Sequence, residues 1–165
     1  MTRSVIARPL SAQHFAAFGD VLEVQGDPDK LINQGLCGRH HDRGRMDFST
    51  GRAGISLFDA QPRSLPFVLE MMERHPDGSQ AFIPMHQNPY LVVVAKDAGG
   101  APAQPVAFVA QPGQGVNYHR NVWHGVLCPL APPGLFAVVD RIGDGANLQE
   151  HWFDVPWQIT GDAPG

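Results

Sequence analysis

Lysine is nearly absent from this chain of 165 residues, which contains only Lys30 and Lys96. The other basic residues are arginines dispersed along the sequence, and 16 acidic residues bring the formal net charge to −4. A nucleic-acid-binding surface needs clustered positive charge to neutralise phosphates. The composition therefore argues against a nucleic-acid partner.

Cysteine is also scarce, since Cys37 and Cys128 are the only two. The first ten residues include Arg3, Arg8 and Pro9 and lack the apolar core of a secretory signal. We therefore expect a cytoplasmic protein whose thiols stay reduced. The longest apolar run, residues 91–95, is far too short to span a bilayer, so we expect no membrane association.

Sustained helical periodicity is missing after Gly19. Short apolar runs rich in Val, Ile and Phe recur instead, separated by many of the 18 glycines and 15 prolines. This pattern predicts one β-rich domain over residues 1–165, with barrel-like strand spacing. The segment from Val92 to Val94 is apolar throughout, which predicts a strand buried on both faces.

Two further segments have distinct patterns. Residues 11–19 predict a short N-terminal helix, with Ser11 as its N-cap and Gly19 in a left-handed closing position. Residues 26–54 are polar and show little periodicity. A stretch of this length in a compact domain is usually functional or mobile.

Chemistry-bearing residues first gather between Glu73 and Gln80. Glu73 and His75 are two positions apart, so on an extended strand their side chains share one face. A tight turn at Asp77-Gly78 would return the chain as a hairpin and bring Gln80 beside His75. The alternative is a hairpin at the surface, in which Glu73, Arg74 and His75 are solvated and have no chemical role.

A second cluster ends at His124, after a turn rich in proline and glycine. Trp123 and His124 alternate faces, so one of them must point inward. If His124 does, it meets His75 across the barrel and the two imidazoles form half of a metal site. A lone histidine beside a tryptophan is otherwise more often a packed core residue.

These two clusters resemble the ureidoglycolate lyases of allantoin degradation. The matching blocks extend in order over most of the chain, from about Pro9 to Asp154. They are Ile32–Gly35, Glu73–Met85, Gly115–His124 and Asp140–Arg141, together with Pro9-Leu10 and Phe15–Val21.

The resemblance implies a cupin-type jelly-roll barrel, and we expect a homodimer. It aligns Glu73, His75, Gln80 and His124 with the metal-ligand positions of cupins, and it implies a divalent metal, nickel in some members. Here Glu73 replaces a histidine and Gln80 replaces a glutamate, which weakens the ligand set because an amide is a neutral ligand. No organic cofactor is implied.

The activity implied is cleavage of ureidoglycolate to glyoxylate and urea, which needs a base for the hydroxyl proton and an acid for the urea nitrogen. We assign catalysis to His75, Gln80 and His124, leaving open which imidazole is the base. The candidates for substrate binding are Asn33, Arg39, Arg74, Asn117, Tyr118 and Arg141, with Arg39, Arg74 or Arg141 holding the carboxylate. Two alternatives are a cupin that binds a small molecule without catalysis and a hydrolase that releases ammonia.

Overall fold

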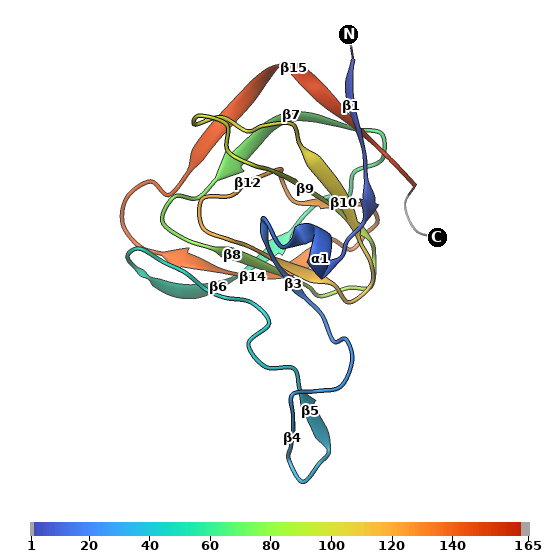
Figure 1. Ribbon diagram of the computed structural model, residues 1–165, viewed down its shortest axis with the longest axis vertical. Helices are drawn as coiled ribbons and strands as arrows, with labels where there is room; N and C mark the ends of the chain where they lie inside the picture. The colour runs from blue at the N-terminus through green and yellow to red at the C-terminus, as the bar shows by residue number, and fades with distance from the viewer. Residues whose placement is uncertain (1, 163–165) are drawn as a thin grey trace.

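The computed structural model describes residues 2–162, which form an all-β barrel with one short helix (Figure 1). This confirms the predicted fold class. The elements in chain order are β1 (Arg3–Ile6), β2 (Arg8–Pro9), α1 (Ala12–Phe15), β3 (Gly19–Leu22), β4 (Lys30–Ile32), β5 (Cys37–Arg39), β6 (Arg52–Asp59), β7 (Phe67–Arg74), β8 (Gln80–Pro84), β9 (Tyr90–Ala95), β10 (Val106–Ala110), β11 (Gly115–Tyr118), β12 (Trp123–His124), β13 (Cys128–Pro129), β14 (Leu135–Ile142) and β15 (Gln149–Thr160).

Two sheets make up the barrel. The larger has the strand order β1-β15-β7-β12-β9-β10-β2, with β13 also paired to β9, and the smaller has the order β3-β11-β8-β14-β6. In Figure 1 the strands β15 and β7 lie above β9 and β10, while β3, β8 and β14 lie below them. Strands β9 and β10 therefore form a middle layer.

The middle layer has an apolar cluster on each side, because the side chains of β9 alternate between its faces. Val92 and Val94 join the cluster facing the smaller sheet, which includes Phe136. Val93 joins the cluster on the other side, with Leu69 of β7. All residues of β9 are buried, so the prediction of a strand buried on both faces is confirmed.

The N-terminal helix is present but shorter than predicted. The Ser11 hydroxyl accepts a hydrogen bond from the His14 amide at 3.3 Å, as predicted for an N-cap. The expected left-handed ending at Gly19 is wrong, because the helix ends at Phe15 and Gly19 begins β3. A Cβ at Gly19 would lie 2.0 Å from the carbonyl oxygen of Asn117, so close packing of β3 on β11 requires glycine there.

The polar segment between β3 and β6 contains a hairpin of its own. Strands β4 and β5 pair only with each other and project from the barrel (Figure 1). Asp29 joins the two legs at the base, since its carboxylate accepts hydrogen bonds from the His41 amide at 2.9 Å and the Arg43 guanidinium at 2.7 Å. We call residues 29–43 the arm.

Two further observations concern the expected environment of the protein. Within residues 2–162, none of the helical segments has the length and apolar character needed to cross a membrane. Cys37 is exposed on the arm and Cys128 is buried in the barrel, and both are free thiols, as predicted.

Candidate active site

The connection between β7 and β8 builds one side of the site. Glu73 is the second-last residue of β7, His75 follows the end of that strand, and Gln80 is the first residue of β8. The predicted hairpin is wrong, because β7 belongs to the larger sheet and β8 to the smaller one. The turn instead crosses between the sheets, and it still brings Gln80 Oε1 to 3.1 Å from His75 Nε2.

The second imidazole comes from β12, which lies next to β7. His124 is the register partner of Glu73, and the ring centroids of His75 and His124 are 5.1 Å apart. The two rings therefore meet where β12 lies beside the end of β7, rather than across the barrel. The ring of Tyr118 is stacked on His124, with centroids 4.3 Å apart and planes 10° apart, which fixes the orientation of the imidazole.

Hydrogen bonds to carbonyl oxygens fix the protons of both imidazoles, because a carbonyl can only accept. His124 Nδ1 donates to Val122 O at 3.1 Å, and His75 Nδ1 donates to Asn147 O at 2.8 Å. In each neutral ring the lone pair is therefore on Nε2. His124 Nε2 is buried without a hydrogen-bond partner and faces Glu73 Oε1 at 3.6 Å, too far for a good hydrogen bond.

His75 Nε2 has a different environment. The Gln80 amide group donates from Nε2 to Asp140 Oδ2 at 3.0 Å, so its oxygen must face His75. That contact is a hydrogen bond only when His75 Nε2 carries a proton. Burial, followed by the proximity of His124, nevertheless lowers the pKa of His75. Gln80 thus orients the proton on His75 Nε2, and the lowered pKa of His75 favours release of that proton.

Charge in the site is concentrated on Glu73. The facing imidazole of His124 holds the pKa of Glu73 below its ordinary value against the opposing effect of partial burial, and His75 contributes further. Burial, and then the charge of Glu73, raises the pKa of Tyr118 well above its ordinary value. The site therefore combines an ionised carboxylate with a neutral phenol.

The donor set fits a divalent metal. One ligand atom from each of Glu73, His75 and His124 lies within 4.8 Å of the others. Two imidazole nitrogens and a carboxylate are a common ligand set for first-row transition metals. The unpartnered His124 Nε2 agrees with that use, because a buried lone pair without a donor suits a cation. Gln80, the fourth predicted ligand, has its amide nitrogen bonded to Asp140.

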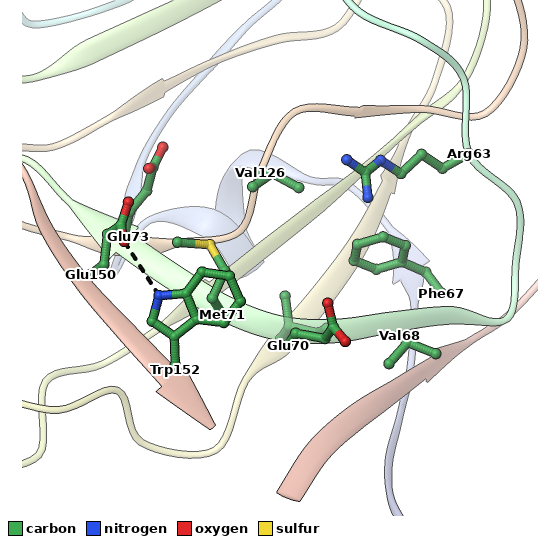
Figure 2. A pocket seen from close by; sticks show the side chains of 10 residues that line it. Arg63, Phe67, Val68, Glu70, Met71, Glu73, Val126, Glu150 and Trp152 are labelled. Carbon is green, nitrogen blue, oxygen red and sulfur yellow. Dashed lines mark hydrogen bonds between the residues drawn. The ribbon is translucent and has the colours of Figure 1, made fainter. Parts of the chain in front are cut away.

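A pocket of about 340 Å³ runs along β7 and reaches Glu73 (Figure 2). Trp152 and Glu150, joined by a hydrogen bond of 3.3 Å, lie near Glu73 at one end. Arg63 lies at the other end, with its guanidinium 5.6 Å from the centroid of the Phe67 ring. The residue linking this pocket to the two histidines is therefore Glu73.

The remaining barrel candidates are committed to other contacts. Arg74 donates to Gln149 and Asp97 and lies over the Trp123 ring, and Arg141 donates to Thr50 and Asp144. Asn117 is buried on the sheet face opposite to Tyr118, where it donates to Asp20 and to the carbonyl of Arg45. Tyr118 is the one substrate-binding candidate that the barrel brings into contact with His124.

Asn33 and Arg39 lie on the arm, away from the histidine pair (Figure 1). Asn33 is at the tip and Arg39 is the last residue of β5, and both are exposed. Among the described residues, no side-chain hydrogen bond or ion pair involves Arg39. The structure does not bring either residue to the site of its own chain.

Sequence reasoning did not identify two residues that orient His75. Asp140 pairs with Gln80 in the register of β14 and β8, and it accepts the Gln80 amide hydrogen bond. Asn147 supplies the carbonyl for His75 and also accepts a hydrogen bond from the Asp77 amide through its side chain at 2.7 Å. Asp140 lies in a block that resembles the family, which was the available signal.

The chain also matches known proteins over almost its whole length. The family model described as ureidoglycolate lyase matches residues 2–160. The chain belongs to the ureidoglycolate lyase family.

Individual members of the family give the same result. A ureidoglycolate lyase of Rhodobacter capsulatus is 60% identical over 158 residues, covering 95% of this chain and 98% of the relative. Ureidoglycolate lyase 2 of Rhizobium meliloti is 51% identical over 92% of this chain and 94% of its own. A ureidoglycolate lyase of Mesorhizobium japonicum is 49% identical over 96% and 98%. Neither alternative, a binding module or an ammonia-releasing hydrolase, is favoured by these matches.

Proposed function

We propose that this chain cleaves ureidoglycolate to glyoxylate and urea, as a step of purine nitrogen breakdown through allantoin. The observation that carries the proposal is the pair of buried imidazoles, His75 and His124, with ring centroids 5.1 Å apart beside an ionised carboxylate. Membership of the ureidoglycolate lyase family supports the same activity.

The reaction needs two proton transfers at one carbon, which the two histidines can perform. His124 Nε2, which has a free lone pair, takes the proton of the substrate hydroxyl as its oxygen forms the carbonyl of glyoxylate. The C–N bond breaks, and the urea nitrogen receives the proton that Gln80 orients on His75 Nε2. Proton transfer from His124 back to His75 restores the starting state.

Glu73, His75 and His124 would hold a divalent metal, nickel by family resemblance. When bound there, such an ion supplies a positive charge that polarises substrate oxygens. Ligation uses the same imidazole lone pairs as acid–base chemistry. A metal bound by both histidines and an acid–base pair are therefore alternative uses of these atoms, which a chelator distinguishes.

The assembly is part of the proposal. We infer a cytoplasmic homodimer, in agreement with two free thiols and with exposed apolar side chains on the outer face of the smaller sheet. Ile55 and Leu57 of β6 and Ile83 of β8 point away from the barrel core, with exposed fractions of 77%, 66% and 43%. A row of this kind is typical of a contact with another protein.

The experiment is a product assay with purified protein and ureidoglycolate, with and without chelator. We expect equal amounts of urea and glyoxylate and no ammonia. Ammonia with carbon dioxide would instead identify a hydrolase, and binding of glyoxylate without turnover would identify a binding module. Activity that is lost with chelator and restored by nickel assigns the histidines to a metal, whereas unchanged activity assigns them to proton transfer.

A further inference from the structure

We propose that the arm of one chain docks on a second copy of this chain and that Arg39 binds the substrate carboxylate in the partner's site. This inference rests on the proposed function and names the positively charged residue that would hold the substrate carboxylate. Its first support is the arm itself. An isolated two-stranded hairpin is at best marginally stable in water, so a projecting one calls for a partner surface.

The composition of the arm fits a contact surface. Leu31 and Leu36 are 63% and 88% exposed, so this short hairpin leaves two large apolar side chains uncovered. Asn33 and Gln34 at the tip have φ values of 51° and 57°, a left-handed conformation that is rare outside glycine. A tight hairpin turn requires such values, so the tip presents its exposed side chains on a defined backbone.

The identity of the partner follows from the position of the arm. In Figure 1 the arm extends beyond the smaller sheet, on the side away from β9 and β10. The outer face of that sheet carries the exposed row of Ile55, Leu57 and Ile83. A second copy seated against this face would lie beside the arm, and two-fold symmetry would place its own arm beside the first chain.

Arg39 is the residue that the partner's site lacks. Among residues 2–162, no hydrogen bond or ion pair joins an arginine or lysine side chain to Glu73, His75, Gln80, His124 or Asp140. The substrate is an anion, and Glu73 and Asp140 add negative charge at its site. Arg74 and Arg141 are bonded elsewhere, whereas Arg39 is exposed and its planar guanidinium suits a carboxylate.

Arg63 is the competing cation within the chain, because it lines the same pocket as Glu73. Figure 2 places the two at opposite ends of that pocket. Glu70 and Glu150 also line it, so an anion would meet further negative charge there. The negative charge in this pocket favours Arg39 over Arg63 as the residue that binds the substrate carboxylate. The variant Arg63→Ala decides between the two arginines.

The test is complementation between two impaired chains, assayed as kcat/KM at substrate concentrations well below KM. His124→Ala and Arg39→Ala chains carrying different affinity tags are co-expressed, and heterodimers are isolated through both tags. If Arg39 acts on the partner, the Arg39→Ala subunit keeps His124 and receives an intact Arg39, so each heterodimer should show about half the wild-type kcat/KM per dimer. If Arg39 acts within its own chain, one site lacks His124 and the other lacks Arg39, so the kcat/KM of the heterodimer is no higher than that of the Arg39→Ala protein.

Two further measurements separate the proposal from a structural effect. Arg39→Ala should lower kcat/KM about ten- to a hundredfold, chiefly through KM, because one charged hydrogen-bonding group is lost, while Arg39→Lys recovers part of it. Arg3→Ala, on the exposed strand β1, should retain wild-type activity, and Arg63→Ala should lower kcat/KM less than Arg39→Ala does. Wild-type activity in Arg39→Ala, or loss confined to Arg63→Ala, would overturn the proposal.

The docking of the arm has a readout that does not require activity. Leu36→Asp should weaken the dimer by at least about tenfold in Kd by light scattering, while Ile6→Asp, at a position of β1 that is 75% exposed, should not. A monomeric wild-type chain, or a dimer insensitive to Leu36→Asp, would refute docking. If the wild-type dimer forms through the arm but ureidoglycolate is not cleaved, the proposed function fails and the docking stands.

Discussion

The histidine site and the arm use polar residues in opposite ways. At the site, each functional side chain is oriented by another group of the same chain: Tyr118 stacks on His124, and Asp140 positions Gln80. On the arm, Arg39 and the leucines are exposed. The difference indicates that one chain prepares the proton-transfer groups by itself, while the arm is built for an external contact.

The largest expected effect concerns the histidine site, whose functional side chains are oriented by groups of the same chain. His124→Ala should lower kcat by two or more orders of magnitude, as roughly expected for loss of a general base. His14→Ala, on the helix α1 and exposed, is the matched control and should retain full turnover. Steady-state kinetics with circular dichroism of both variants provides the measurement. Turnover within about threefold of wild type in His124→Ala would end its assigned role.

The sequence could predict which residues meet at the site better than how they meet. The spacing of Glu73, His75 and Gln80 grouped these three residues, and the family resemblance added His124 to them. The prediction placed Glu73, His75 and Gln80 on one hairpin, whereas the chain crosses between sheets after His75. Whether a turn ends in the same sheet depends on long-range pairing, here of β8 with β11 and β14, which local patterns do not encode.

The same limit explains the two residues that were missed. Asp140 and Asn147 act on Gln80 and His75 from about 60 to 70 positions away in the chain, through strand register and a loop carbonyl. Every residue has a backbone carbonyl, so the identity of Asn147 does not reveal that its carbonyl contacts His75. The hairpin of the arm was not predicted, because the three-residue strands β4 and β5 are too short to show periodicity.

A smaller effect is expected from adding charge to the two regions. Gln80→Glu would place a second carboxylate beside Asp140, whose oxygen lies 3.0 Å from the Gln80 amide nitrogen. At pH 8 we expect the free energy of unfolding to fall by about 1–3 kcal/mol, because an acceptor replaces a donor next to a charge. The same change on the arm, Gln34→Glu, should stay within about 0.5 kcal/mol.

A double variant identifies the cause. Asp140→Asn supplies an amide donor to Glu at position 80, so adding it to Gln80→Glu should recover most of the loss in urea unfolding. Equal stability of Gln80→Glu and wild type would show that the hydrogen bond between Gln80 and Asp140 does not stabilise the site.

The smallest expected effect is the response of the metal-free protein to pH. The pKa of His75 in the folded chain lies below its ordinary value of 6.5, so between these two values the unfolded chain binds more protons. The free energy of unfolding should therefore decrease as the pH falls below about 6.5, and decrease further below about 4.5 as Glu73 is protonated. Urea unfolding at a series of pH values, after treatment with chelator, measures this. His75→Gln should flatten the upper part of the curve and leave the lower part in place, since the folded pKa of Glu73 is lowered chiefly by His124. An unchanged upper slope in His75→Gln would assign the acid sensitivity to groups outside the histidine pair.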